Sequence, residues 1–403
     1  MCIKIGIRKN LRYPVLLILC NSLLDIDEII MKNYFNYYKG YFIYCVLIFL
    51  SQFFSGLIPL LIFKCTNRKK THKRYANGFN LIQGKDKIKQ ADSLCKILLL
   101  LFFASYFNLI GVIVRRKYFT RNNLDLPKRG FFIEHRFKSI QIEVSALLSY
   151  LTLKIKIYRH QKFSLITISI FLILIMILDV IDDPGLLKKI KYVFLSAFSN
   201  IARSFLDTIE KYLFDYNFLR PFSILLYEGL IGSLFIPLLL LIDNDTYEDF
   251  KDIQCNRKIL LPLIIFFTLF LIINAFKNIY RVLTIQYYSS MTRALAESIL
   301  DPFILYYFYL TIKDYGNNNE VYFALIISCL LIIAFCSLVY NDFIVLYCCE
   351  MQTNTYREIN NRLYGNPKDA ILNENDSDSD ENDNDENGND ENEEKNKELK
   401  LKN

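Results

Sequence analysis

The sequence lacks the short motifs that mark the commonest nucleotide-driven and hydrolytic sites. It holds no Walker A phosphate loop, no Gly-x-Ser-x-Gly nucleophile elbow and no His-Glu-x-x-His zinc motif. Histidine occurs only three times, at His72, His135 and His160, in or near polar and basic stretches. ATP-driven pumping and metallohydrolase chemistry therefore have no visible apparatus, and we expect neither an enzyme nor a cofactor.

Paired cysteines are missing too. The ten cysteines are scattered singly, mostly in apolar runs, and no two have the Cys-x-x-Cys spacing. Cys348 and Cys349 are adjacent and follow the last apolar run, where they are either ordinary thiols or palmitoylation sites. The sequence predicts neither a disulfide framework nor a zinc site.

What the chain has in abundance is apolar residues. Hydrophobic residues make up 53% of its 403 residues and aromatic residues 15%, in runs that extend from end to end. This composition predicts a polytopic membrane protein that lies in the lipid bilayer and does not bind nucleic acid. The formal charge of +7 is uneven, because residues 371–403 hold 13 acids and 4 lysines and the rest is strongly basic. A basic body suits membrane orientation and anionic ligands.

The apolar runs predict ten membrane-spanning helices in two sets of five. An Asp-Asp-Pro-Gly turn at residues 182–185 separates the sets. We expect a first repeat over 1–185, a second over 186–350 and a disordered, acidic cytosolic tail over 351–403. The predicted spans are 11–31, 38–63, 97–114, 133–157 and 163–181, then 190–214, 221–242, 259–283, 288–310 and 322–346.

The first span has a rival interpretation. Residues 1–10 are cationic and precede an apolar run, as in a secretory signal peptide, but no small-x-small cleavage site follows. We expect 11–31 to be a retained helix, with peptidase removal as the alternative. Ten spans place both termini on one side of the membrane, and the basic loop over 64–96 predicts that this side is the cytosol.

The ninth span carries a polar stripe. Ser290, Arg293, Glu297 and Asp301 fall at helical spacing on one face of an apolar segment. An ionised side chain costs roughly 2.5 to 3.5 kcal/mol near the bilayer centre, so these charges must pair with one another or line a wet cavity. Pro302 tends to kink or break the helix beside Asp301. We interpret the stripe as one wall of a binding site.

The fourth span is polar in the same way. Lys138, Gln141, Ser145 and Ser149 share one face, and Glu143 lies beside it. The stretch before it, SYFNLIGVIVRRKYF, resembles NAFKNIYRVLTIQYY before the ninth span. Polar helices at matching positions of two repeats point to a transporter's central site.

Structural roles for the same charges remain as alternatives. Arg293 and Glu297 could form a buried salt bridge that fixes helix packing, and Lys138 could be an interfacial anchor if the fourth helix starts later. Arg203 and Asp207 lie one turn apart on the sixth span and could pair. Three further polar residues lie near predicted helix ends: Asn108, Lys277 and Arg281. Their alternative role is to snorkel, that is, to extend their polar ends to the membrane surface.

Two stretches resemble a known family. SAFSNIARSFLDTIEKYLFDYNFLRPFSILLYEGLIGSLF resembles nucleotide-sugar transporters and their relatives, in which a Ser-rich helix runs into Glu-Lys-apolar-Leu, here residues 210–213. IQIEVSALLSYLTLKIKIYRHQKFSLITISIFLILI is similar to their fourth and fifth helices. The resemblance covers roughly residues 11 to 350. It implies the drug/metabolite transporter superfamily, with ten helices, two inverted five-helix repeats and alternating access around a central cavity. The chain lacks the Gly-Ala-Leu-Asn-Lys and Phe-Tyr-Asn-Asn signatures, so the resemblance does not set the substrate.

Together these features predict an all-α secondary transporter for a small polar, anionic metabolite of the nucleotide-sugar or sugar-phosphate class. Lys138 and Arg293 would neutralise the substrate's charge. Glu143, Glu297 and Asp301 would orient those cations or bind hydroxyls and protons, and Gln141 and Ser290 complete the expected site. The resemblance places the carrier in an ER-type or Golgi-type membrane, with homo-oligomer formation left open. The alternative is a multi-pass membrane scaffold or receptor that transports nothing.

Overall fold

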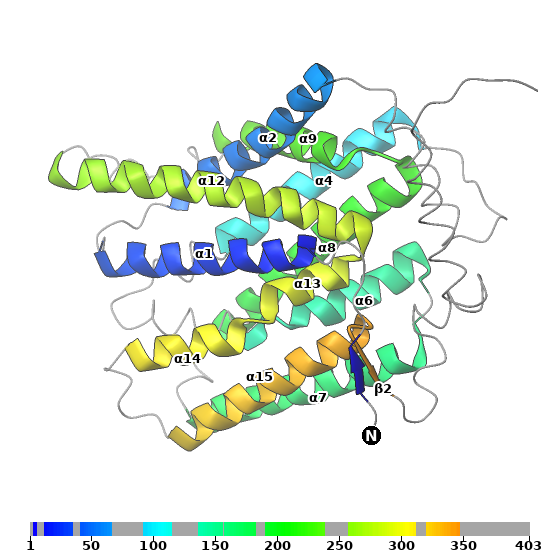
Figure 1. Ribbon diagram of the computed structural model, residues 1–403, viewed down its shortest axis with the longest axis vertical. Coiled ribbons are helices and arrows are strands. Elements are labelled where there is room, and N and C mark those ends of the chain that lie inside the picture. The colour runs from blue at the N-terminus through cyan, green and yellow to red at the C-terminus, as the bar shows by residue number, and fades with distance from the viewer. Residues whose placement is uncertain are drawn as a thin grey trace, which may run out of the picture. The chain divides into compact units, whose positions relative to one another are not determined.

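The structure is a computed structural model in which nearly all of the described chain is helical (Figure 1). It describes residues 3–5, 12–34, 41–66, 92–114, 136–155, 157–182, 190–237, 257–311 and 320–346. All of these belong to the first of two units, Met1–Tyr347 and Cys348–Asn403. In chain order the elements are β1 Ile3–Ile5, α1 Arg12–Tyr34, α2 Tyr41–Thr66, α4 Leu94–Ile113, α6 Ile140–Leu153, α7 Arg159–Asp182, α8 Ile190–Asn217, α9 Pro221–Leu234, α12 Arg257–Tyr287, α13 Ser290–Ser298, α14 Asp301–Thr311, α15 Glu320–Tyr340 and β2 Ile344–Leu346.

Five of these helices are long and apolar enough to cross a membrane. They are α2, α4, α7, α12 and α15, with spanning segments of 20 to 27 residues. Two shorter helices, α6 and α9, are apolar as well. The prediction of a helical membrane protein is confirmed at this level.

Polar and apolar side chains are distributed as a bilayer requires. Large apolar side chains such as Phe102, Ile170 and Ile265 are exposed on the outside of the bundle. Serines and charged residues are buried inside it, among them Ser105, Ser145 and Glu228. Lipid solvates the apolar exterior, whereas the interior supplies the partners that buried polar groups need.

Most helices pack mainly against helices from distant parts of the sequence. The most extensive contacts join α2 to α9, α7 to α15, α1 to α12, and α4 to α8. Further contacts join α2 to α12, α4 to α9, α6 to α8 and α6 to α13. The charged helices α8 and α13 therefore meet in the interior, where they both touch α6.

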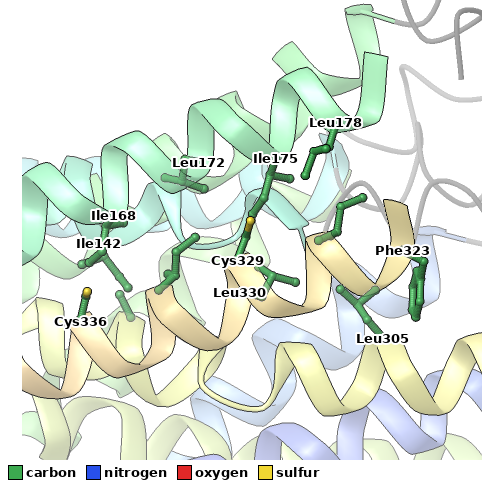
Figure 2. Packing of buried hydrophobic residues seen from close by; sticks show 13 residues of the cluster. Ile142, Ile168, Leu172, Ile175, Leu178, Leu305, Phe323, Cys329, Leu330 and Cys336 are labelled. Atoms are coloured by element: carbon green, nitrogen blue, oxygen red, sulfur yellow. The ribbon is translucent and has the colours of Figure 1, made fainter. Parts of the chain in front are cut away.

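The α7–α15 pair forms the larger apolar core. Ile168 and Cys336 lie at one end of it, and Leu178 and Phe323 lie at the other, so the two helices run antiparallel (Figure 2). Ile142 of α6 packs into the same cluster. These contacts pack α6 and the α13–α14 segment against the apolar α7–α15 pair.

The α2–α9 pair is held by glycines at close approach. A Cβ on Gly229 would come within 2.5 Å of the backbone nitrogen of Phe53, and one on Gly56 would collide with the backbone of Leu226. Small residues let two backbones approach closely, which is how helices associate in membranes without a hydrophobic driving force between them. Because Gly56 meets Leu226 while Phe53 meets Gly229, these two helices also run antiparallel.

The predicted ninth helix is broken, as its proline suggested. α13 ends at Ser298 and α14 begins at Asp301, with Pro302 in the first turn, where its missing N–H breaks no intrahelical bond. The kink or break expected beside Asp301 is confirmed, and the predicted span 288–310 consists of two helices. Asp301 starts a new helix and does not extend the stripe on α13.

Two other predicted boundaries need correction. The fourth helix starts at Ile140 rather than near residue 133, and the tenth ends at Tyr340. After the tenth helix, β2 pairs antiparallel with β1, with Ile3 opposite Leu346. The cationic start of the chain thus contributes a strand, so the described fold is not strictly all-α. The predictions about the acidic tail over 351–403, Cys348, Cys349 and the basic loop concern residues that lie largely outside the described part of the chain.

Candidate functional site

A polar cavity lies between helices of both halves of the sequence. Its volume is about 90 Å³, enough for several waters, since one needs roughly 10–15 Å³. α1, α2, α4, α8, α12 and α13 contribute its walls. The apolar lining residues are Leu24, Ile48, Val112, Leu206 and Phe270, and the polar ones are Asp25, Gln52, Asn108, Arg203, Asn274, Lys277, Asn278, Arg281, Arg293 and Glu297.

Arg293 connects α13 to α8 in the charge network around this cavity. Its Nη1 donates to Asp207 Oδ2 on α8 at 2.6 Å, and its Nη2 donates to Glu297 Oε1 on α13 at 3.0 Å. The short helix that carries Arg293 is capped at its start by Ser289, whose side-chain oxygen accepts a hydrogen bond from the Thr292 N–H. Every residue of α13 is buried, and Arg293 lines the cavity.

Arg281 of α12 forms ion pairs with three carboxylates. Its Nη2 lies 2.6 Å from Glu210 Oε1 and 3.3 Å from Glu228 Oε2, and its Nη1 lies 3.8 Å from Asp207 Oδ1. All three acids are fully buried. A guanidinium suits this position because it presents five donors in a fixed fork.

Glu297 is surrounded by cations in the same way. Besides Arg293, Lys277 Nζ lies 3.6 Å from Glu297 Oε1 and Arg203 Nη1 lies 3.9 Å from Glu297 Oε2. Three helices, α8, α12 and α13, thus converge on one carboxylate. The two looser contacts are ion pairs beyond hydrogen-bond distance.

The cavity wall carries an excess of positive charge. Four cations line it, Arg203, Lys277, Arg281 and Arg293, whereas the lining acids are Asp25 and Glu297. The carboxylates of Asp207, Glu210 and Glu228 contact the arginines but do not form part of the wall. The surface that a ligand would meet is cationic, with balancing acids behind it.

The residues predicted from the sequence divide between this network and its surroundings. Arg293 and Glu297 line the cavity, and Gln141 Nε2 donates to Asp207 Oδ2 at 3.1 Å. Lys138 and Asp301 form a buried ion pair of 3.3 Å. This pair links the start of the polar fourth helix to the start of α14.

Two predicted residues belong neither to the cavity wall nor to the charge network around it. Ser290 exchanges a hydrogen bond with Ser149 of α6 at 3.3 Å, which ties the start of α13 to α6. Glu143 is on another side of α6, within hydrogen-bonding reach of Ser169 on α7 and near Tyr340 on α15. Neither residue lines the cavity.

The structure also decides three pairing alternatives. Lys138 is 7% exposed and bonded to Asp301, so it is not an interfacial anchor even though its helix starts late. Arg281 is 3% exposed, so the snorkelling interpretation was wrong for it. Asp207 has its closest cation in Arg293 on α13, whereas Arg203, one turn away, points to Glu297.

Three members of the charge network were not predicted as site residues: Glu210, Glu228 and Lys277. Glu228 is the single charged residue in α9, and that isolation in an apolar helix was the available signal. Lys277 and Arg281 were placed too near the end of their helix, because α12 continues to Tyr287. Within the described residues, no group of three or more His, Cys, Asp or Glu side chains is arranged to hold a metal ion.

Comparison with known proteins finds no matching family model and no matching curated protein.

Proposed function

We propose that this protein is a secondary membrane transporter that moves a small polar anion by alternating access. The observation that carries the proposal is the cavity between the helices, whose wall holds four cations and two acids. A carrier needs such a site inside the membrane-embedded bundle, reached from either side in turn. Nucleotide sugars and sugar phosphates are the substrate class we favour, because they combine phosphate with hydroxyl groups.

The geometry suits reversible capture of an anion. Arg293, Lys277 and Arg203 all contact Glu297, so an incoming phosphate can replace Glu297 as their partner. An arginine fork binds phosphate oxygens bidentately, and these bonds strengthen in a site of lowered dielectric. When no anion is bound, Glu297 neutralises these cations, which avoids the cost of unpaired buried charges.

The helix contacts support the two-repeat architecture. The two-repeat architecture pairs each helix of the first half with a counterpart in the second: α1 with α8, α2 with α9, α4 with α12, α6 with α13–α14 and α7 with α15. Exchanging each helix with its counterpart then converts the α1–α12 contact into α8–α4, and α2–α12 into α9–α4. The pairs α2–α9, α7–α15 and α6–α13 convert into themselves. A two-fold relation between halves predicts this set of contacts.

The helix directions favour an inverted relation between the halves. The counterparts α2 and α9 run antiparallel, and so do α7 and α15. Rotation about the membrane normal would leave counterparts parallel, whereas rotation about an axis in the membrane plane reverses them. This agrees with the resemblance to the drug/metabolite transporter superfamily. An experimental structure in which 11–182 do not superpose on 190–346 after such a rotation would refute this part of the proposal.

One observation favours the rival, a membrane scaffold or receptor. The four cations of the wall each lie within 4 Å of an internal carboxylate, which is also what a packing device requires. Buried ion networks can fix a unique arrangement of helices without binding anything. The two functions therefore differ in whether an external anion can displace Glu297.

A ligand screen on purified protein separates the two functions. Nucleotide sugars, sugar phosphates and amino acids are added one at a time while the melting temperature is measured, because a ligand that binds only the folded state raises it. Compounds that stabilise the protein are then tested for uptake into proteoliposomes. We expect at least one phosphate compound to do both, with Glu143→Gln behaving like wild type because Glu143 is outside the cavity. No stabilisation and no uptake across the panel would favour the scaffold.

A further inference from the structure

Two buried carboxyl groups share one guanidinium nitrogen behind the cavity. Glu210 of α8 and Glu228 of α9 both contact Arg281 Nη2, at 2.6 and 3.3 Å, and both are fully buried. Glu210 Oε2 and Glu228 Oε1 accept no hydrogen bond from the described residues. Neither group takes part in the proposed anion binding.

Among the described residues, Arg281 is the cation that contacts both acids. Besides Arg281, the charged groups that face the pair are Asp207 on α8 and Arg293 on α13. Gln52 of α2 donates to Glu228 Oε2 at 3.4 Å, and Ser105 of α4 donates to the Glu228 carbonyl. Three carboxylates thus face two guanidiniums, and the Arg293 guanidinium also binds Glu297.

The two acids compete for one donor. Glu210 Oε1 and Glu228 Oε2 both approach Arg281 Nη2, and each carboxyl has an oxygen that accepts no hydrogen bond from the described residues. Ionised carboxylates only accept hydrogen bonds, so two of them cannot bond to each other, whereas a protonated acid can donate its O–H to its neighbour. Two like charges in a shared buried site otherwise repel strongly.

We propose that Glu210 and Glu228 hold one exchangeable proton between them, and that anion binding in the cavity promotes its uptake, making the protein an anion–proton symporter. The proton-binding part stands on the geometry of the pair alone. The coupling part rests on the proposed transport function. The proton comes from the aqueous phase and is released to it, so no other reactant is needed.

Asp207 provides the route between the two sites. It is bound to Arg293 at 2.6 Å and lies 3.8 Å from Arg281. When an anion binds Arg293, the ion pair between Asp207 and Arg293 weakens. The ion pair between Asp207 and Arg281 then strengthens. Arg281 then neutralises Glu210 and Glu228 less well, so the pair binds a proton more tightly. Linkage is reciprocal, and protonation of the pair therefore tightens anion binding to the same degree.

Infrared spectroscopy of the purified, substrate-free full chain tests the proton site. We expect a carbonyl band of a protonated carboxylic acid that shifts in D₂O and titrates with pH. Glu210→Gln and Glu228→Gln should each remove the same component of this band, because the proton is shared, whereas Asp92→Asn should leave that component. Glutamine mimics the neutral acid, so both variants should fold. Absence of the band from wild-type protein at every pH at which it stays folded, or a band identical to that of wild type in both variants, would overturn the proton site.

The pH dependence of anion binding tests the coupling. The panel of phosphate compounds is repeated across a pH series, with the rise in melting temperature as the readout. We expect wild type to be stabilised more at low pH and Glu228→Gln to respond equally at every pH. Equal stabilisation of wild type across the series would overturn symport and leave the transport proposal intact. If no anion stabilises the wild type, transport and coupling fail together, and the infrared result still decides the proton site.

Discussion

Arg293 Nη1 lies 2.6 Å from Asp207 Oδ2, across a sequence separation of 86 residues. This bond joins α13 to α8 at the wall of the cavity, and Asp207 also receives a hydrogen bond from Gln141 of α6. One carboxylate thus organises three helices around the site. The first prediction follows from breaking this bond.

Arg293→Ala should leave Asp207 and Glu297 without their closest cation. Removing one partner of a buried pair typically costs about 3–5 kcal/mol, so we expect a lower melting temperature. Adding Asp207→Asn should recover part of that loss, because the uncompensated charge is then gone. Neither protein should be stabilised by phosphate compounds. A folded Arg293→Ala protein with the wild-type anion response would contradict the assignment of Arg293 to the site.

Arg281 and Lys277 offer a matched comparison on one helix, one turn apart. Arg281→Met leaves three buried carboxylates without their common partner, so we expect little folded protein after membrane extraction. Lys277→Met should fold, because Glu297 retains Arg293 at 3.0 Å, but should lose anion binding. Size-exclusion profiles and the anion panel measure the two effects. Equal yields of folded protein from both variants would argue against a central role for Arg281.

The α2–α9 contact should be intolerant of added volume. Gly229→Leu forces side-chain atoms against the backbone of Phe53, and overpacking typically costs about 1–3 kcal/mol or more where backbone must move. Leu230→Ala, at the neighbouring exposed position, is the control and should have little effect. Thermal unfolding of both proteins in the same detergent checks this. A Gly229→Leu protein as stable as the control would mean that the two helices are farther apart.

Asp92 gives a pH-dependent test outside the membrane-spanning segments. Its carboxylate accepts hydrogen bonds from Lys96 at 2.7 Å, Tyr212 at 2.9 Å and Asn217 at 3.1 Å, and chiefly the Lys96 bond lowers its pKa below the ordinary value of 3.8. A lowered pKa in the folded state means that the ionised form stabilises the protein above the ordinary pKa. That stabilisation is lost as the pH falls through the lower folded-state value.

The measurement compares wild type with Asp92→Asn. We expect a small difference in melting temperature that is constant above about pH 5 and shrinks at more acidic pH. The effect is small because Lys96 is exposed and solvent screens the pair. A difference that grows as the pH falls would have the wrong sign and would rule out this account of Asp92.

The sequence by itself determined the class of protein and the positions of most helices. Apolar runs fix where helices lie, because a bilayer demands about 20 apolar residues with all backbone groups bonded internally. Local rules also placed the break at Pro302 and the pairing of Arg293 with Glu297, which are one helical turn apart. These features depend only on neighbours along the chain.

Only the tertiary structure decided which acid meets which cation. Arg281 could be recognised as buried, and Glu228 as its partner, only after α9 and α12 had been brought together. The i, i+4 rule favoured Arg203 as the partner of Asp207, but Arg293 and Arg281 compete for that acid from other helices. Helical periodicity says which residues share a face, whereas the partner across that face is set by how the helices pack. In a buried site, where each unpaired charge is costly, that packing determines the charge network and hence the candidate site.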